Sequence, residues 1–403
     1  MHEHSTNFFD IDSAEFRRDP YPFYRRLRET EPMHFSNRGL WVSTRHADIK
    51  TILSSRRFAK NFLAGVGRQQ GEKVLQEPAY KALGNMLLVQ DPPDHTRMRK
   101  LVAKAFSNSS VVKIEPQVRE IVGELLDEIV PRGGMDFIAD FAHFVPVLVI
   151  CKILGIPKEF WKVFSNPNTN SGRITELQPM EPDELLKANR GASQSALFFK
   201  MLCDRRRSDP QDDLITHLVQ AEEEGATLTQ DELTANISLL FAAGHETTKH
   251  TLGNSLLALH QNPDQWALLQ SDRKWIPGAV SECLRYDSAV QVTYREACED
   301  TEVGGVVVTR GTGVMAYLGA GNRDPEAYPD PDVLDVGRVG MAPLSFGGGI
   351  HICLGAPLAQ LEVQVAIEML LERIPSLEIM GVDQPAWGPN KPFRGLSELK
   401  MKW

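Results

Sequence analysis

A single cysteine, Cys353, lies between three consecutive glycines and the start of an apolar helical pattern, in the segment FGGGIHICLG that spans residues 346–355. Glycines let the backbone turn tightly, so that several N–H groups can point toward one sulfur atom. Those N–H groups, together with the positive end of the following helix, stabilise a thiolate. A thiolate is also a strong metal ligand. The segment therefore predicts a metal ligand, although most lone cysteines are inert buried thiols.

A second group of reactive side chains interrupts an apolar stretch, where Ala243-Gly244-His245-Glu246-Thr247-Thr248 introduces a carboxylate and hydroxyls. Burying such groups without partners costs roughly a few kcal/mol, so they require hydrogen bonds or a function. The functional interpretation is a proton relay, in which Thr247 hydrogen-bonds an oxygen species at the metal and Glu246 delivers protons through water. The structural interpretation is a threonine that bonds back to the carbonyl four residues earlier, beside a solvated acid. Gly244 leaves room for a ligand next to the helix.

Two helices are expected to position these groups. The first begins after Thr229, because Thr229-Gln230-Asp231-Glu232 has the form of a capping box, and it runs toward Pro263. Its apolar residues recur every three or four positions, which predicts a helix that passes through the interior. The second starts near Cys353 and ends before Pro375.

A phosphate-binding loop would also use glycines, but the cysteine segment has neither the required lysine nor a dinucleotide-type spacing. It resembles instead the haem-binding signature of the cytochrome P-450 superfamily, through Phe346, Gly349, His351, Cys353 and Gly355. The resemblance extends along nearly the whole chain, from Asp19-Pro20-Tyr21-Pro22 to Arg394-Gly395-Leu396. It implies a mainly α fold with small β-sheets, in which haem b lies between the long central helix and the cysteine-loop helix.

The resemblance also assigns roles to individual residues. Phe346 is expected beside the sulfur, and His351 is expected to reach a haem propionate. Further propionate contacts are expected from His95 and Arg99, which lie four apart on one helix face, and from Arg295. The position of His245 points away from the iron in this family, so a structural role is expected there.

A structural ion-pair network is implied by Glu282 and Arg285, three residues apart on one helical face, with Arg338 as the expected partner. By itself such a pair is usually solvated, but it resembles the family's Glu-x-x-Arg element. Buried behind the cysteine loop, it would support haem incorporation, and removing one member would cost about 3 to 5 kcal/mol.

The implied reaction inserts one oxygen atom of O2 into a lipophilic small molecule, with electrons from a ferredoxin and its reductase. The form of the 243–248 segment is similar to bacterial members that hydroxylate or epoxidise polyketides, macrolides, terpenoids or steroids. Substrate contacts are expected from the ranges 61–88, 166–180 and 290–293 and from the central helix. The pocket residues predicted are Leu87, Leu88, Leu240, Ala243, Val290 and Val292.

Two other functions stay open on the sequence. A peroxide-driven haem peroxygenase is disfavoured by the Glu246-Thr247 pair, because peroxide brings its own protons. A haem-binding sensor without turnover is disfavoured because no signalling domain accompanies the chain. A basic face with Arg97, Lys100 and Lys104 could dock an acidic ferredoxin.

Composition bounds the remaining possibilities. The 403 residues contain 42% hydrophobic and 24% charged residues and no Pro/Gly/Ser-rich linker, which predicts one domain over 1–403. The net charge of −9 argues against a nucleic-acid partner. Five cysteines without a CxxC pair and a polar N-terminus favour a cytoplasmic protein with no membrane segment. A monomer is expected because most soluble relatives are monomeric.

Two strand pairs are predicted where short β-branched or aromatic runs flank a glycine. The first joins His34-Phe35 to Leu40-Trp41-Val42, and the second joins Val306-Val307-Val308 to Val314-Met315-Ala316 around Arg310-Gly311-Thr312.

Overall fold

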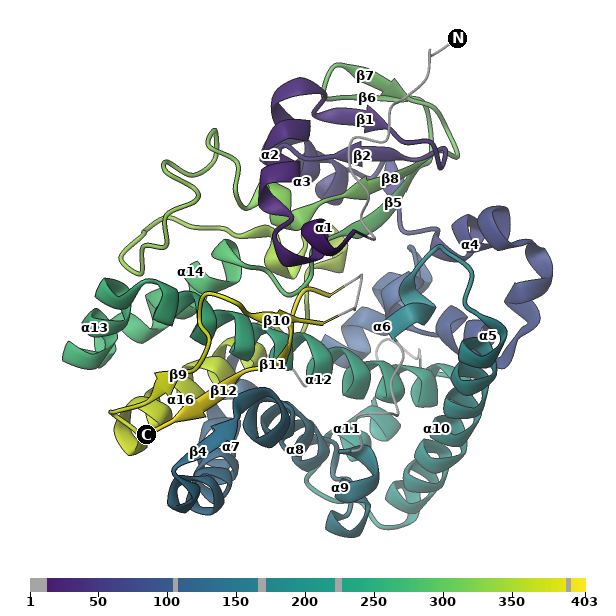
Figure 1. Ribbon diagram of the computed structural model, residues 1–403. Helices are drawn as coiled ribbons and strands as arrows, with labels where there is room; N and C mark the ends of the chain where they lie inside the picture. Colours follow the sequence, from purple (N-terminus) through teal and green to yellow (C-terminus); the bar gives the residue numbers. More distant parts are fainter. Residues whose placement is uncertain (1–12, 104–107, 166–171, 222–226, 389–392) are drawn as a thin grey trace.

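The computed structural model describes residues 13–103, 108–165, 172–221, 227–388 and 393–403 (Figure 1). Helices dominate and the sheets are small, as predicted. The α-helices are α1 Ala14–Arg18, α2 Tyr21–Thr30, α3 His46–Ser54, α4 Phe62–Gln70, α5 Pro78–Gly84, α6 Asp94–Ala103, α7 Asn108–Ile129, α8 Phe144–Leu154, α9 Lys158–Phe164, α10 Pro182–Ser208, α11 Leu214–Gln220, α12 Gln230–Gln261, α13 Pro263–Ser271, α14 Ile276–Tyr286, α15 Leu318–Gly321 and α16 Ala356–Arg373. The strands are β1 Met33–Phe35, β2 Trp41–Ser43, β3 Phe58–Ala59, β4 Gly134–Asp136, β5 Thr293–Ala297, β6 Thr301–Val303, β7 Val306–Val308, β8 Gly313–Ala316, β9 Glu378–Ile379, β10 Ala386–Trp387, β11 Leu396–Glu398 and β12 Lys400–Lys402.

The central helix α12 begins where its capping box predicts. The Thr229 hydroxyl accepts a hydrogen bond from the Glu232 N–H at 3.2 Å, and the Glu232 carboxylate accepts one from the Thr229 N–H at 2.8 Å. The helix then crosses the middle of the molecule and packs against α8, α10, α14 and α16 (Figure 1). The prediction of an interior helix is therefore confirmed, and α16 likewise lies between Cys353 and Pro375.

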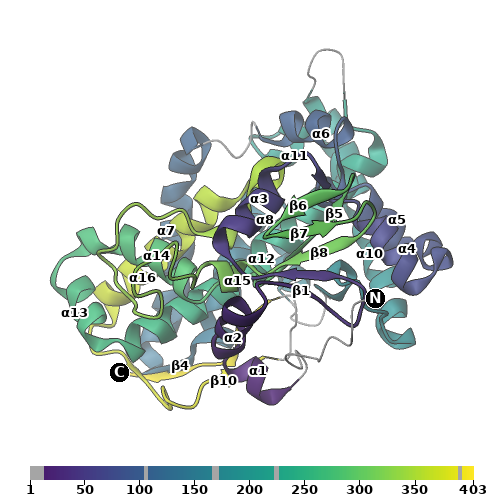
Figure 2. The ribbon, with the colours of Figure 1, turned by 90° about the horizontal axis from the view of Figure 1, so that it is seen from above.

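The five-stranded sheet has the order β1-β2-β8-β5-β3 and lies on one side of the helical body (Figure 2). The predicted pair of β1 and β2 is confirmed, with His34 opposite Val42. The predicted pair of Val306–Val308 with 314–316 is wrong, because β7 pairs with β6 instead. Gly304 and Gly305 connect those two strands at φ +58° and +78°, which suits a two-residue hairpin whose twist matches that of its strands. Strand β8 pairs with β2 and β5.

The largest hydrophobic cluster lies among α7, α12, α14 and α16. Among the described residues, one helical stretch, Phe137–Leu154, is long and apolar enough to cross a membrane, and 72% of it is buried inside the protein. It packs against α7 and α12, as a core helix does. The expectation that residues 1–403 form one domain stays a prediction.

Candidate active site

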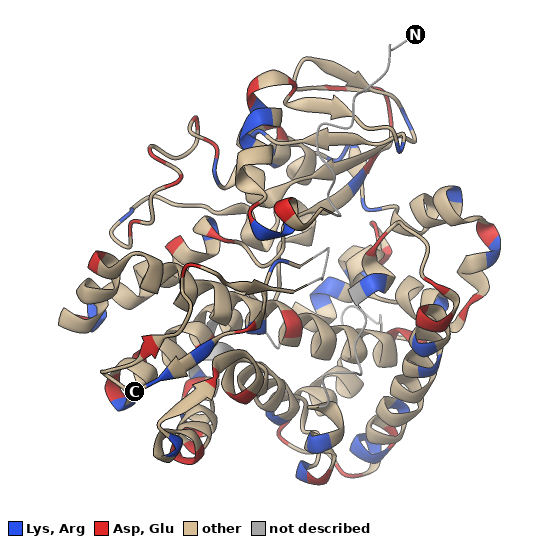
Figure 3. Ribbon diagram, viewed as in Figure 1, with Lys and Arg blue, Asp and Glu red and all other residues tan. Residues whose placement is uncertain are grey.

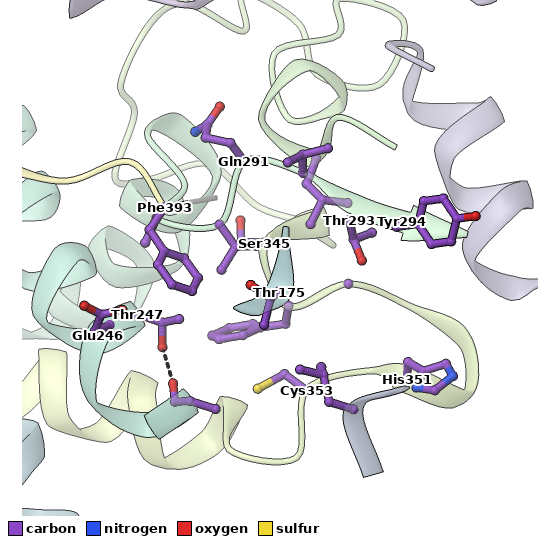
Figure 4. A pocket seen from close by; sticks show the side chains of 18 of the residues that line it. Thr175, Glu246, Thr247, Gln291, Thr293, Tyr294, Ser345, His351, Cys353 and Phe393 are labelled. Atoms are coloured by element: carbon purple, nitrogen blue, oxygen red, sulfur yellow. Dashed lines mark hydrogen bonds between the residues drawn. The ribbon is translucent and has the colours of Figure 1, made fainter. Parts of the chain in front are cut away.

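One cavity of about 710 Å³ lies between α12 and the cysteine loop (Figure 4). Its size is that of a ligand or cofactor pocket. Most of the residues predicted for the site line it: Leu87, Leu88, His95, Arg99, Leu240, Ala243, Glu246, Thr247, Val290, Val292, Arg295, Phe346, His351, Cys353 and Gly355. The structure thus brings together residues that are up to 268 positions apart, from Leu87 to Gly355.

The cysteine loop is shaped by glycines at two positions with positive φ, Gly347 and Gly349. A Cβ on Gly349 would lie 2.0 Å from the Leu53 carbonyl oxygen, so that position accepts glycine only. The Cys353 N–H donates to the Phe346 carbonyl at 2.9 Å, which closes the loop and turns Cys353 toward the cavity. Gly349 therefore acts through the loop and does not itself line the cavity.

The pKa of the Cys353 thiol is raised, contrary to what the glycine loop alone suggested. Cys353 is accessible from the cavity, but the surrounding protein desolvates the thiol, and this raises its pKa more than the Gly355 and Ala356 N–H groups and the Arg99 guanidinium lower it. The helix terminus and N–H donors therefore do not suffice to ionise the sulfur. A metal cation bound by Cys353 would supply the missing stabilisation, since a coordinating thiol is deprotonated outright.

Two histidines present donors to the cavity edge. The rings of His95, on α6, and His351 lie 4.3 Å apart between centroids. The Nε2 atoms of both are buried and have no hydrogen-bond partner among the described residues. His351 Nε2 lies 3.9 Å from Asp91 Oδ1, beyond hydrogen-bond distance, whereas buried polar atoms normally have a partner, so a group in the cavity fits both rings. Burial lowers the pKa of His95 to about 4, so this ring is neutral at physiological pH until an anion approaches.

Two arginines lie at the same edge. Arg295, on β5, is 3% exposed and donates to the Tyr294 carbonyl at 2.8 Å. Arg99 donates to the Ile352 carbonyl at 2.7 Å, next to the cysteine. Arg295 is buried and Arg99 is partly exposed, and cations that bind only neutral acceptors at a cavity edge fit a cofactor with carboxylates at its edge.

On α12, the Thr247 hydroxyl donates to the Ala243 carbonyl at 2.7 Å, so the back-bonded arrangement is present (Figure 4). Its oxygen still faces the cavity and retains lone pairs that can accept a hydrogen bond. Burial raises the pKa of Glu246, while the Lys249 ammonium lowers it. Glu246 is thus a partly buried acid and not the solvated surface acid of the structural interpretation. A Cβ on Gly244 would meet no atom within 4 Å, which leaves the space that was expected there.

The predicted ion-pair network is formed in full. Arg285 binds the Glu282 carboxylate through Nε and Nη2, both at 2.7 Å, and Arg338 Nε lies 3.2 Å from the same carboxylate. Glu282 and Arg285 are 0% exposed. The network lies on α14 beside the segment that leads to the cysteine loop, as expected.

Sequence reasoning missed two residues. Lys60 lines the cavity next to Arg295, although 235 positions separate them and no spacing rule connects them. His143 is the hydrogen-bond partner of His245, at 3.1 Å, and His245 lies outside the cavity lining as expected. A lone buried histidine in an apolar run, such as His143 before VPVLVI, is a weak signal of a paired polar group.

The basic face suggested on α6 is only partly available. Figure 3 shows basic residues on α6, but Arg97 forms an ion pair with Glu232 at the start of α12 and with Asp94 at 3.1 Å. Arg97 therefore anchors α6 to α12 and is not a free docking cation. Lys104 lies outside the described residues, as do residues 166–171 of the predicted substrate loop.

Comparison with known proteins defines the class of this site. The family model of cytochrome P-450 matches residues 183–278 and 269–386. The 6-deoxyerythronolide B hydroxylase of Saccharopolyspora erythraea is 34% identical over 98% of both chains. The vitamin D(3) 25-hydroxylase of Pseudonocardia autotrophica is 36% identical over 98% of this chain and 96% of its own. The structure of P450BioI with an acyl carrier protein ligated to hexadec-9Z-enoic acid covers 97% of this chain and 99% of its own, with 34% identity and a TM-score of 0.89.

The chain belongs to the cytochrome P-450 family. Members of this family are haem b-containing oxidoreductases, and the chain's relatives are named as monooxygenases and hydroxylases. The sequence-based expectations of fold, cofactor and enzyme class are thereby confirmed.

Proposed function

We propose that the protein inserts one oxygen atom from O2 into a C–H or C=C bond of a lipophilic secondary metabolite, such as a polyketide, macrolide, terpenoid or steroid. The observation that carries the proposal is that Cys353 and the Glu246-Thr247 pair line one cavity from two different elements (Figure 4). The names of two relatives, a 6-deoxyerythronolide B hydroxylase and a vitamin D(3) 25-hydroxylase, support the substrate class.

Haem would be held by the thiolate of Cys353, with His95, Arg99, Arg295 and His351 on its propionates. Phe346, Gly349 and Gly355 would shape the loop around the sulfur. When bound there, haem supplies the activation of O2, helped by electron density from the thiolate. The unpartnered Nε2 donors of His95 and His351 support this arrangement.

Glu246 and Thr247 would handle protons on the cavity side of α12. Because burial raises the pKa of Glu246, this acid keeps its proton to a higher pH than a solvated glutamate does. The Thr247 hydroxyl donates to Ala243, so its oxygen is held as a hydrogen-bond acceptor toward the cavity.

The substrate would lie against apolar side chains that several elements contribute. Leu87 and Leu88 come from the segment before α6, Leu240 and Ala243 from α12, and Val290 and Val292 from the segment before β5. We further propose that the protein acts as a cytoplasmic monomer with a ferredoxin and its reductase, and with no nucleic-acid or membrane partner. The acidic net charge of −9 agrees with the absence of a nucleic-acid partner.

A carbon monoxide difference spectrum of the reduced protein tests the iron–sulfur bond. The strongly red-shifted band is expected in the wild type and in a Cys298→Ala control, which removes another exposed cysteine. The band is expected to be lost in Cys353→Ala. A wild type without the band, or a Cys353→Ala variant that keeps it, contradicts the proposed haem site.

Turnover separates the proposed reaction from the peroxygenase and sensor alternatives. Candidate lipophiles are first titrated against the ferric protein, where a substrate changes the spin state. Product that forms with reduced ferredoxin and O2 supports the monooxygenase. Product that forms only with hydrogen peroxide favours the peroxygenase, and no product with any driver favours a sensor.

A further inference from the structure

Lys60 follows strand β3 and is 9% exposed, with its ammonium group facing the cavity edge. Its Nζ lies 3.4 Å from the Thr293 hydroxyl, which also accepts a hydrogen bond from Arg295 Nη1 at 3.3 Å. Two buried cations thus converge on one neutral hydroxyl (Figure 4 shows Thr293 at this edge). No carboxylate of the described residues forms an ion pair with either cation within 4.0 Å.

The nearby carboxylates do not neutralise this edge. Asp91 accepts hydrogen bonds from the backbone N–H groups of Lys60 and Asn61 at 2.8 and 2.9 Å, which turn it toward the main chain. Glu296 follows Arg295 on β5, but it is bound by Arg68 and Asn61 and does not line the cavity.

The charges therefore do not balance within the protein. When Lys60 is protonated, Lys60, Arg99 and Arg295 carry three positive charges and Asp91 carries one negative charge, so the edge then has an excess of two positive charges. Haem b carries two propionates, which match that excess. An unpaired buried cation is costly, because desolvation favours its neutral form.

The pKa values reflect this cost. Burial lowers the pKa of Lys60 to about 7, with a further lowering from Arg295 and an opposing effect from Asp91. Burial likewise lowers the pKa of Arg295 to about 10. A carboxylate beside these groups would restore the charged form of both.

We propose that Lys60 binds a haem propionate, together with Arg295, and so helps retain the cofactor. This inference rests on the proposed haem site. A substrate carboxylate is the other anion that the ammonium could bind, but Lys60 shares its hydroxyl partner with Arg295, on the polar edge that also holds His351 and Asp91. Of the apolar residues expected to contact substrate, Leu87, Leu88, Leu240 and Ala243 come from other segments, whereas Val290 and Val292 precede Thr293.

The test measures how fast the holoprotein transfers haem to excess apomyoglobin. Lys60→Met is expected to accelerate transfer about ten-fold or more, since a hydrogen bond to a charged group is lost. Lys60→Arg, which keeps the charge, is expected to stay near the wild-type rate. Lys81→Met is the matched control, because it makes the same substitution at an exposed position outside the cavity. Lys60→Gln replaces Lys60→Met if the latter does not fold.

A second readout is the ferric/ferrous reduction potential. Removal of a cation near the haem stabilises the more positive ferric form, so the Lys60→Met potential is expected to fall below that of Lys81→Met. A transfer rate and potential equal to those of Lys81→Met would overturn the proposal.

A spin-state titration with hexadecanoate and its methyl ester distinguishes the two anions. If Lys60 binds a substrate carboxylate, Lys60→Met weakens the binding of hexadecanoate but not that of the ester, and the rate of haem transfer is unchanged. That result would also overturn the proposal. Failure of the haem site itself would appear differently, as a wild type without the carbon monoxide band.

Discussion

His245 Nε2 lies 3.1 Å from His143 Nδ1, and His143 Nε2 lies 2.7 Å from the carbonyl oxygen of Ser165. A carbonyl oxygen only accepts hydrogen bonds, so the neutral His143 ring carries its proton on Nε2. Its Nδ1 therefore accepts a hydrogen bond from His245 Nε2–H. These two hydrogen bonds connect α12, one residue before Glu246, to the start of α8 and the end of α9. The histidine of the 243–248 segment therefore positions helices and does not contact the cavity.

A double-mutant cycle tests this pair. His143→Phe strands the buried His245 donor and is expected to lower the free energy of unfolding by about 1 to 3 kcal/mol. Because the two residues are in direct contact, the cycle of His143→Phe with His245→Phe is expected to give a coupling energy of about 1 kcal/mol, measured by urea unfolding. His217→Phe, at an exposed position on α11, is the control. Additive effects of the two substitutions would show that the pair contributes no coupling.

Glu282→Gln is expected to destabilise the protein by about 3 to 5 kcal/mol, because it leaves the fully buried Arg285 without its counter-charge. Haem content and urea unfolding measure the effect, and both are expected to fall together. Asp204→Asn removes a carboxylate from exposed pairs with Lys200 and Arg207, so it is expected to change the stability little. Equal effects of the two substitutions would contradict a structural role for the buried network.

Thr247→Val is expected to lower the fraction of reducing equivalents that appear in product and to raise hydrogen peroxide formation. The substitution preserves shape but removes the acceptor that we place at the cavity. Thr234→Val is the control, because the Thr234 hydroxyl makes the same kind of back-bond, to Gln230 at 3.1 Å, on α12 but outside the cavity lining. Peroxide and product are measured against electrons consumed. If both variants couple equally well, Thr247 has no special part in the reaction.

Stability is expected to fall as the pH drops below about 6.5, partly because of His250. This ring is 3% exposed and neither nitrogen has a hydrogen-bond partner among the described residues. Burial lowers its pKa from 6.5 to about 3. Between these pH values the unfolded chain therefore binds a proton at His250 that the folded chain does not. Above pH 6.5 this difference does not lower the free energy of unfolding, and the loss of stability grows progressively as the pH falls toward 3.

The corresponding measurement is the free energy of unfolding between pH 5 and 7 for the wild type and His250→Gln. The wild-type slope should exceed that of the variant by up to about 1.4 kcal/mol per pH unit, the value for one proton. His217→Gln, at an exposed site, serves as control. Parallel wild-type and His250→Gln curves would mean that His250 is not held neutral by the fold.

Features that depend on neighbours along the chain follow from the amino-acid sequence alone. The capping box at Thr229, the helix after Cys353 and the Glu282-Arg285 pair are set by local spacing, so residue types and intervals suffice to predict them. The glycine-rich cysteine segment predicted the metal ligand, and the apolar periodicity after Thr229 predicted the central helix; only the family resemblance implied that haem lies between them.

Features that depend on packing between distant segments were settled by the folded chain. Folding placed Lys60 beside Arg295, gave His245 its partner His143 and paired β7 with β6 rather than with β8. It also raised the pKa of the Cys353 thiol through burial, against the effect of the local N–H donors. The cause is the same in each case, because burial and long-range contact depend on which surfaces meet in space, and residue spacing carries no direct record of that.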